Sequence, residues 1–186
     1  MSKIKITNAR LSFNSIFNAE SKFEGTDPKF SAMLILDPRT EEGKANLVNI
    51  KSTIRELEKE KLKGKELPIE CIPLQDGSLK EYSGWEGNVI VSAASKKRPV
   101  VVGRKRQPVA EQDTVDVPYA GCNVNCIVDA WAMDHPTFGQ RVVFELKAIQ
   151  FSGDNEPFVA SGVDISTDFD EIEGDVEEVS SSVFDL

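Results

Sequence analysis

The chain has 186 residues, the length of one ordinary domain, and 40% of them are apolar, enough to bury a core without metals or disulfides. Its purely apolar runs, such as Val100–Val102, are too short to span a bilayer, and the first residues lack the pattern of a signal peptide. Secretion and membrane insertion are therefore not expected, and the net charge of −9 argues against a uniformly basic protein.

The negative charge is confined to the C-terminal segment. Residues 164–186 contain nine acidic and no basic side chains, whereas residues 1–163 contain 22 of each. The segment has few large apolar residues and a serine run at Ser180–Ser182, a composition typical of disorder. The sequence therefore predicts a folded body over residues 1–163 and a disordered acidic tail over residues 164–186.

The first half of the body predicts two strands and a helix. Ile4–Phe13 is expected to be extended, Asn14–Lys29 is a polar stretch, and Phe30–Leu36 is the next strand candidate. Apolar residues then recur at three- and four-residue steps between Thr40 and Leu62, which predicts one amphipathic helix that packs on the core.

The second half predicts four further strands. They are expected at Asn88–Ala93, Pro99–Val102, Asn123–Trp131 and Arg141–Ala148, with Trp131 in the core. The short link His135–Gly139 predicts that the last two strands form a long hairpin. His135 is expected to lie at the surface of this hairpin. Several strands with a single helix favour a mainly β fold: an OB-fold-like (oligonucleotide-binding) β-barrel with one capping α-helix.

The residues that carry chemistry are cations beside aromatic side chains. The triplets Lys96-Lys97-Arg98 and Arg104-Lys105-Arg106 flank an extended segment and would lie about 20 Å apart along a straight strand. Tyr82 and Trp85 precede them, and Tyr119 follows. Single-stranded nucleic acid is bound by such a combination, because unpaired bases stack on aromatic rings while Lys and Arg neutralise the phosphates. Lys22 and Lys29 are further phosphate candidates. The alternatives are a solvated loop or a targeting signal, since short basic runs are not specific.

The acidic tail ends in an apolar residue, Phe184, followed by Asp185 and Leu186. A flexible polyanion can occupy a basic groove in place of DNA, and Phe184 with Asp185 can be presented to a partner protein. The alternative is a tail that only keeps the protein solvated.

An enzymatic function finds little support in the sequence. His135 is the single histidine, and no glycine-rich phosphate loop or His/Cys ligand cluster occurs, so neither a cofactor nor a metal is expected. Three cysteines cannot all pair, and we interpret them as buried apolar residues in a reducing cytoplasm. One nuclease alternative would use aspartates to hold Mg²⁺; these are Asp113, Asp116, Asp129 and Asp134.

Three blocks occur in the order known from one phage family: Glu81–Gly87, Ser95–Val102 and Tyr119–Asn125. Shorter matches are Asp27–Ser31, Ala148–Phe151 and Glu156-Pro157. Over about residues 1–160 the chain resembles the single-stranded DNA-binding proteins of tailed phages. The resemblance implies an OB-fold body that coats single-stranded DNA during phage replication and recombination, and an acidic tail that contacts replication partners.

The chain departs from this family at two places. An acidic residue often follows the Pro-Val-Val block, where this chain has Gly103 and Arg104, and related replication proteins tend to end on their aromatic residue.

Together these observations predict a non-enzymatic protein of the infected host's cytoplasm that binds single-stranded DNA largely independently of sequence. Phage or host replication proteins are expected partners of the tail, and a homodimer or a cooperative assembly on DNA is a further expectation. A phage scaffolding or interaction protein without DNA binding is the main alternative function.

Overall fold

The computed structural model describes residues 2–158. Its seven strands and one α-helix follow each other along the chain, with two short 3₁₀-helices, η1 (Ile69–Cys71) and η2 (Gly77–Leu79). The longer elements are β1 (Ser2–Glu20), β2 (Lys29–Leu36), α1 (Glu41–Lys61), β3 (Leu74–Asp76), β4 (Val89–Ser95), β5 (Val100–Val102), β6 (Asn123–His135) and β7 (Gly139–Gly153). The predicted tail, with Phe184 and Asp185, and the predicted boundary at residue 163 lie outside the described residues.

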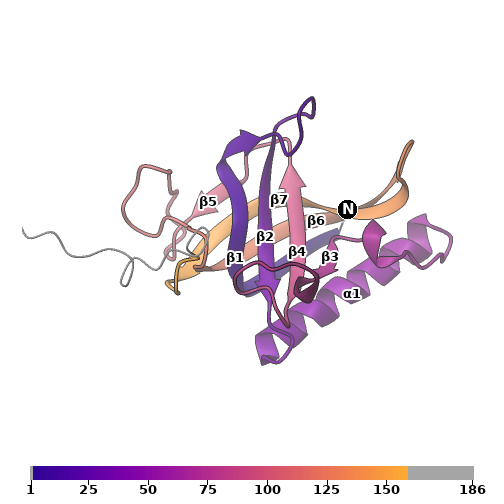
Figure 1. Ribbon diagram of the computed structural model, residues 1–186, viewed down its shortest axis with the longest axis horizontal. Coiled ribbons are helices and arrows are strands. Elements are labelled where there is room, and N and C mark those ends of the chain that lie inside the picture. The colour runs from indigo at the N-terminus through magenta and orange to yellow at the C-terminus, as the bar shows by residue number, and fades with distance from the viewer. Residues whose placement is uncertain (1, 159–186) are drawn as a thin grey trace, which may run out of the picture.

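Five strands close into a barrel (Figure 1). The sheet order is β3-β4-β2-β1-β6-β7-β5, and an additional pairing of β4 with β7 closes the ring. All pairings are antiparallel except those that β7 makes with β4 and β5. The closure rests on one residue pair, Ala94 with Glu145. The predicted OB-fold-like barrel with a single helix is confirmed.

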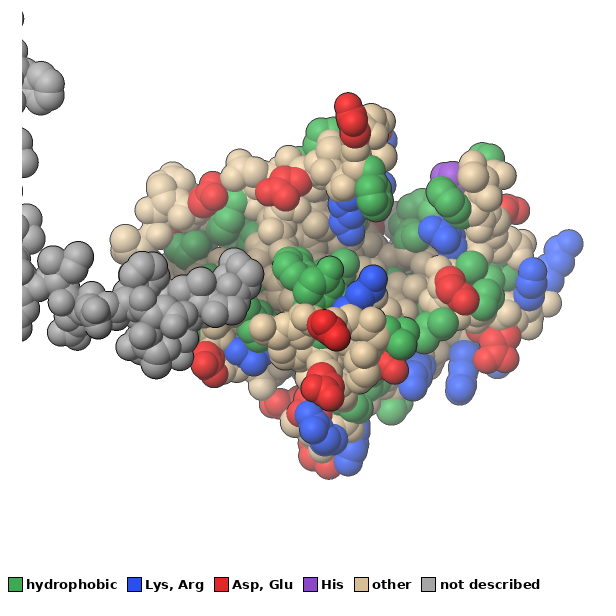
Figure 2. Space-filling view, in the orientation of Figure 1, with side chains coloured by type: hydrophobic (Ala, Val, Ile, Leu, Met, Phe, Trp, Pro, Cys, Tyr) green, Lys and Arg blue, Asp and Glu red, His purple; other side chains and the backbone are tan. Residues whose placement is uncertain are grey.

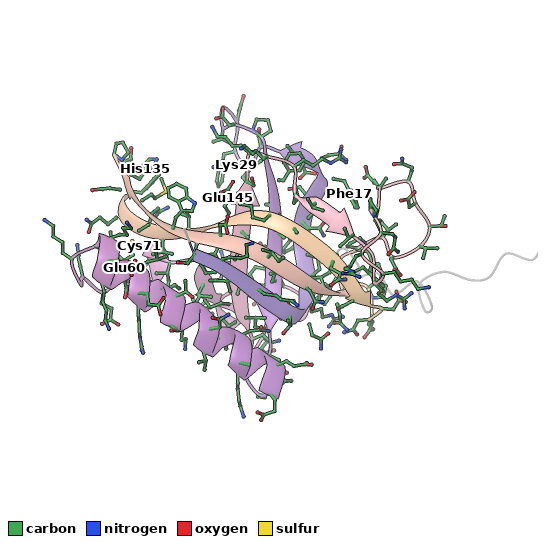
Figure 3. The ribbon with its side chains drawn as sticks, turned by 180° about the vertical axis from the view of Figure 1, so that it is seen from behind. Phe17, Lys29, Glu60, Cys71, His135 and Glu145 are labelled. Atoms are coloured by element: carbon green, nitrogen blue, oxygen red, sulfur yellow. The ribbon has the colours of Figure 1, made fainter. Side chains whose placement is uncertain are left out.

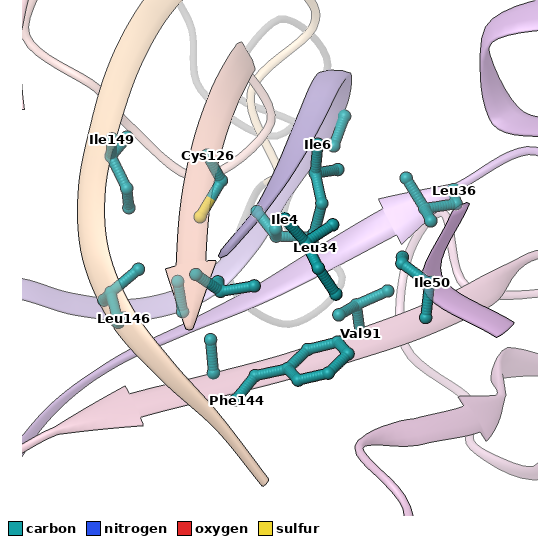
Figure 4. Close-up of a cluster of buried hydrophobic side chains, with 14 of the residues drawn as sticks. Ile4, Ile6, Leu34, Leu36, Ile50, Val91, Cys126, Phe144, Leu146 and Ile149 are labelled. Atoms are coloured by element: carbon teal, nitrogen blue, oxygen red, sulfur yellow. The ribbon is translucent and has the colours of Figure 1, made fainter. Parts of the chain in front are cut away.

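The core lies inside this ring and between the ring and α1 (Figure 4). Every second residue of β6 from Val124 to Ala130 is buried, and the facing row of β7 supplies Phe144, Leu146 and Ile149. Cys122 and Cys126 are both buried there. Since alternate residues of a strand point to opposite faces, Trp131 falls on the other face of β6 and is half-buried. Its predicted place in the core is wrong.

Helix α1 has the bounds that the sequence indicates. Thr40 is its N-cap and accepts a hydrogen bond from the Gly43 N–H at 3.0 Å, and Leu62 is its C-cap. Its buried face includes Leu47, Ile50 and Leu57. Within residues 2–158, no helix is both long enough and apolar enough to cross a membrane.

Strand β1 is much longer than the predicted Ile4–Phe13. It pairs with β6 up to Arg10 and with β2 from Arg10 onwards, so a single strand joins both sides of the barrel. Register shifts between Leu11 and Asn14 and between Ser15 and Glu20 interrupt its alternation, which is why the polar half of the strand has no strand pattern in the sequence.

Candidate nucleic-acid interface

A groove runs across the outer face of β2 and β4. The groove consists of two adjoining hollows, of about 280 and 560 Å³, which share Lys22, Ser31 and Ala94. Its floor consists of small and flexible side chains that point away from the core; these are Ser31 and Met33 of β2 and Ser92 and Ala94 of β4. Figure 2 shows the recess between the β1–β2 loop at the top and the β6–β7 hairpin at the upper right.

Three lysines line the end of the groove formed by the β1–β2 loop. Lys22 and Lys29 come from this loop and the start of β2, and Lys96 follows β4. Lys96 donates a hydrogen bond of 2.7 Å to Asp27, and this contact lowers the pKa of the Asp27 carboxyl below its usual value. Phe23, from the same loop, is 74% exposed. The two loop lysines proposed from sequence and Lys96 of the first triplet thus meet in one place.

An aromatic cluster covers the outer face of β1 and β2 near the other end of β2. The rings of Phe13, Tyr82 and Trp85 meet edge to face, with centroids 4.8 Å apart for Tyr82 and each of Phe13 and Trp85. Phe13 is 54% exposed and Tyr82 is 46% exposed, so each ring has surface open to a ligand.

Trp85 does not lie where the sequence analysis predicts. It was expected to stack on bases, but its side chain is only 2% exposed and packs against Ile35 and Ile90. Its indole Nε1 donates a hydrogen bond of 2.8 Å to Ser12. A ring enclosed in this way has no free face for a base, and its role here is to hold Tyr82 and Phe13 in place.

The first basic triplet protrudes from the seam of the barrel. Between the pairs Ala94–Glu145 and Val100–Ala148, the β4–β5 segment advances six residues while β7 advances three. The surplus residues loop outward, and Lys96, Lys97 and Arg98 are exposed. Lys96 turns toward the groove, whereas Arg98 lines a separate hollow beside Phe17 and Val101.

The second basic triplet lies in the turn after β5. Arg104 forms an ion pair of 2.8 Å with Asp116, which also receives a hydrogen bond from Gln107. This pairing raises the pKa of the Arg104 guanidinium and lowers that of the Asp116 carboxyl. Arg104 therefore shapes its own loop, while Lys105 and Arg106 are exposed and pair with no acid within residues 2–158. Neither Lys105 nor Arg106 lines the groove.

Tyr119 is held by structural contacts as well. Its ring packs against the core beside Phe151, and its hydroxyl donates to Asp154 at 2.9 Å. The Asn155 N–H donates back to that hydroxyl. The structure does not bring Tyr119 to the Tyr82 cluster, and its stacking on a base stays a prediction.

The last described residues lead back to the aromatic cluster. The Phe158 ring lies 4.0 Å from the Arg10 guanidinium and packs on the Ile35–Trp85–Ile90 group. Gly84 makes room for it, because a Cβ at that position would lie 2.7 Å from the ring. Residue 158, where the described part of the chain ends, thus lies beside the aromatic cluster.

Sequence reasoning missed three residues at this surface: Phe13, Phe23 and Arg141. Phe13 belongs to an alternating strand and Phe23 to a polar loop, and a single aromatic residue in either setting gives no distinct signal. Arg141 is an isolated cation in the last hairpin, and only the fold shows that it lines the same groove as Lys22.

The four aspartates of the nuclease alternative do not gather. Asp116 pairs with Arg104, Asp129 lies 3.6 Å from Lys147, and Asp113 accepts from the Ala110 N–H. Among the residues that the structure describes, no three His, Cys, Asp or Glu side chains are grouped in a way that could hold a metal ion.

A closed five-stranded barrel with cations and exposed aromatic rings around a groove on its strand face is typical of the OB-like nucleic-acid-binding proteins. The sequence profile of the family described as "Enterobacter phage Enc34, ssDNA-binding protein" matches residues 2–180. The chain belongs to this family of phage single-stranded DNA-binding proteins.

One phage protein and two solved structures are similar to this chain. Protein p50 of Acyrthosiphon pisum secondary endosymbiont phage 1 is 33% identical over 182 residues, which cover 91% of this chain and 94% of p50. The single-stranded DNA-binding protein of bacteriophage Enc34, solved in complex with single-stranded DNA, has a similar fold, with a TM-score of 0.74 and 22% identity over 84% of this chain and 89% of that one. The single-stranded DNA-binding protein gp2.5 of bacteriophage T7 is more distant, with a TM-score of 0.54 and 11% identity over 92% of this chain and 99% of gp2.5.

Proposed function

We propose that the groove, together with the aromatic cluster that adjoins its floor at Met33, binds single-stranded DNA largely independently of sequence. The observation that carries this proposal is the meeting of Lys22, Lys29 and Lys96 at one end of an open groove. Exposed rings lie beside it at Phe13, Tyr82 and Phe23. Family membership supports the same ligand.

In this proposal the rings and the cations have separate tasks. Phe13 and Tyr82 stack on unpaired bases, which contributes about 1–3 kcal/mol per base and discriminates little between bases. The groove lysines neutralise successive phosphates. The exposed cations outside the groove, Lys97, Arg98, Lys105 and Arg106, extend the phosphate track on either side of β5. The protein acts by binding, and no catalytic step is part of the proposal.

The acidic segment over residues 164–186 is proposed to compete with DNA for the groove and to recruit replication partners through Phe184 and Asp185. Support comes from Phe158, six residues before this segment, whose ring packs on the Ile35–Trp85–Ile90 group of the aromatic cluster. A polyanion tethered to this point would have a high effective concentration at the groove. The body over residues 1–163 would then bind DNA more tightly on its own.

The proposed setting is phage replication and recombination in the cytoplasm of an infected bacterium, with cooperative or dimeric assembly along the strand. Both strands β3 and β5 lie at edges of the sheet, where a second chain could pair.

The test is a binding titration of the full chain and of a 1–163 truncation on a thymidine oligomer across a range of salt concentrations. If about six phosphates are contacted, log K should fall with log salt with a slope near −4, since each contact on a single strand contributes about −0.7. Tighter binding by the truncation supports the competing tail. A slope near zero for both proteins would overturn the proposal.

A charge-matched pair of variants locates the site. Neutralising Lys22, Lys29 and Lys96 as Gln should reduce the slope by about 2, because three phosphate contacts are lost. The control neutralises Lys51, Lys59 and Lys61, which are exposed on α1. Equal losses in both triple variants would show that only the overall charge matters.

A further inference from the structure

A hollow of about 290 Å³ lies beside β5, and we call it the β5 hollow. Apolar side chains form most of its wall; these are Phe17, Pro99, Val101, Pro108, Val109 and Ala110. Among residues 2–158 it shares no lining residue with the groove. Figure 3 labels Phe17, the residue of β1 that lines this hollow, near β5. The β5 hollow is therefore a second concave surface, separate from the groove.

The two basic triplets lie at either end of the strand that forms one wall of the β5 hollow. The first triplet precedes β5 and the second follows it. The segment after the second triplet folds back along the strand, where the Val109 N–H donates to the Val101 carbonyl oxygen at 3.0 Å. This returning segment forms the opposite wall. The fold thus places an apolar hollow between two groups of cations that lie apart in the sequence.

The charge around the β5 hollow is mainly positive. Four cations of the triplets are exposed and form no ion pair among residues 2–158; these are Lys97, Arg98, Lys105 and Arg106. Two acids lie nearby and are held by other groups. Asp113 lines the hollow and accepts a hydrogen bond of 2.8 Å from the Ala110 N–H, and Glu111 accepts one of 2.9 Å from Asn18. The cations therefore outnumber the acids at this surface.

An apolar hollow with cations around it fits an acidic peptide that carries a large apolar side chain. The protein contains such a peptide itself. Residues 164–186 hold nine acids and no base, and the aromatic side chain of Phe184 lies near their end, followed by Asp185. A phenylalanine ring loses apolar surface to water when it enters such a hollow, and an aspartate beside it can pair with Arg98 at the rim.

The described chain ends on the side of the molecule where the β5 hollow lies. The Phe158 N–H donates to the Ala120 carbonyl oxygen at 3.1 Å, close to the end of the β5–β6 loop. Figure 1 shows β5, this loop and the end of the coloured ribbon on one side. Phe184 follows 26 residues after Phe158. A flexible chain of that length spans about 28 Å on average, whereas a body of this size has a radius of gyration of about 15 Å. The hollow is thus within reach of the same molecule.

We propose that the β5 hollow is the docking site of the protein's own C-terminal residues, with the Phe184 ring in the hollow and Asp185 paired with Arg98. The anchor lies outside the groove, so Phe184 does not take the place of a base. It holds the acidic segment over the exposed cations of the two triplets, and DNA is denied these phosphate contacts while the anchor is in place. This effect on DNA rests on the proposed function and names the contact that regulates it.

A photoreactive residue at position 184 locates the anchor directly. In the full chain, Phe184→benzoylphenylalanine should form crosslinks on illumination to peptides that contain Phe17 or residues 99–110, within one molecule. Ile172→benzoylphenylalanine, in the same acidic segment, is the control and should show no preference for these peptides. Crosslinks to the groove around Met33 and Ser92, or none above the control, would overturn the proposal. Crosslinks between two chains would also overturn it and would make the hollow a contact between copies.

Two substitutions in the full chain test the effect on DNA. Phe184→Ala removes the anchor and Ala110→Phe fills the hollow, so each should strengthen binding to a thymidine oligomer severalfold. The double variant should bind no more tightly than either single variant, because both remove the same contact. Ala45→Phe makes the same enlargement at an exposed position of α1 and should match the parent. Additive gains, or an Ala110→Phe variant that matches Ala45→Phe, would contradict the anchor.

The outcomes separate the anchor from the proposed function. If the parent protein binds no thymidine oligomer, the proposed function is wrong, and the crosslinks still decide whether Phe184 docks in the β5 hollow. If the parent binds and the crosslinks fall in the groove, the proposed function stands and the anchor is wrong. Thermal unfolding checks the folding of Ala110→Phe. Should that variant be unstable, the crosslinks decide, because they leave the folded body unchanged.

Discussion

The Trp85 indole Nε1 donates a hydrogen bond of 2.8 Å to the Ser12 hydroxyl, and both groups are buried. The two residues are 73 positions apart. Their contact joins the loop before β4 to the middle of β1. The Phe13 and Tyr82 rings pack on each other and on Trp85, so this bond contributes to the position of both exposed rings of the aromatic cluster.

Ser12→Ala is expected to lower the free energy of unfolding by about 1–3 kcal/mol, because the buried indole N–H loses its acceptor. Urea titration measures this loss. Ser52→Ala, at an exposed position of α1, is the control and should change stability little. Equal stability of the two variants would show that Trp85 is held by packing alone.

Phe13→Ala and Tyr82→Ala are each expected to weaken binding to a thymidine oligomer by about 1–3 kcal/mol, because one stacked base is lost. The unfolding free energy should fall far less than in Trp85→Ala, since both rings are half exposed. Leu79→Ala removes another exposed apolar side chain from the same segment and serves as the control. Binding by the two aromatic variants at the level of Leu79→Ala would contradict the stacking assignment.

Asp27→Asn is expected to strengthen DNA binding severalfold. The carboxylate forms an ion pair of 2.7 Å with Lys96 and repels phosphates at the lysine end of the groove. Because Lys96 lowers the pKa of Asp27, the carboxyl is ionised at neutral pH and its removal should show there in full. Fluorescence anisotropy at low salt measures the change, and Glu60→Gln on α1 removes the same charge elsewhere. An equal gain in affinity in both variants would show that the effect depends on net charge alone.

Stability is expected to fall in alkali through the buried thiols. Burial raises the pKa of Cys126 from 9.0 to about 12 and that of Cys122 to about 11. Above pH 9 the unfolded chain loses these protons while the folded chain keeps them, so stability is present below pH 9 and is lost as the pH rises toward 12.

Each thiol would contribute about 1 kcal/mol of lost stability between pH 8 and pH 10. Urea unfolding of Cys126→Ala at both pH values should therefore show a smaller drop than the parent shows. Val128→Ala truncates the same row of β6 without removing a titratable group and should keep the parent's drop. Identical drops in the two variants would contradict the role of Cys126.

Local patterns in the sequence predict the helix and the last hairpin well. Thr40 caps α1 through its own side chain, and the apolar stripe that follows needs no distant partner to be recognised. The hairpin has its strands close together in the chain, with a turn at His135–Gly139.

The roles that the sequence could not predict depend on contacts with other parts of the chain. Trp85 is enclosed because Ser12 and Ile35 meet it from β1 and β2. Arg104 is paired because a later residue of its loop, Asp116, folds back on it. Exposure of an aromatic ring or availability of a cation is a property of the folded surface, so composition could name the right kinds of residue but not select among them.

The barrel closes through a single residue pair, Ala94 with Glu145, and the groove floor lies on both sides of that pair, with Ser92 on β4 and Val143 on β7. One pair can separate without breaking any other ladder of the sheet. The groove floor therefore crosses the joint of the ring that has the fewest backbone pairs, so a change that loosens this joint would also change the shape of the surface on which DNA is proposed to lie.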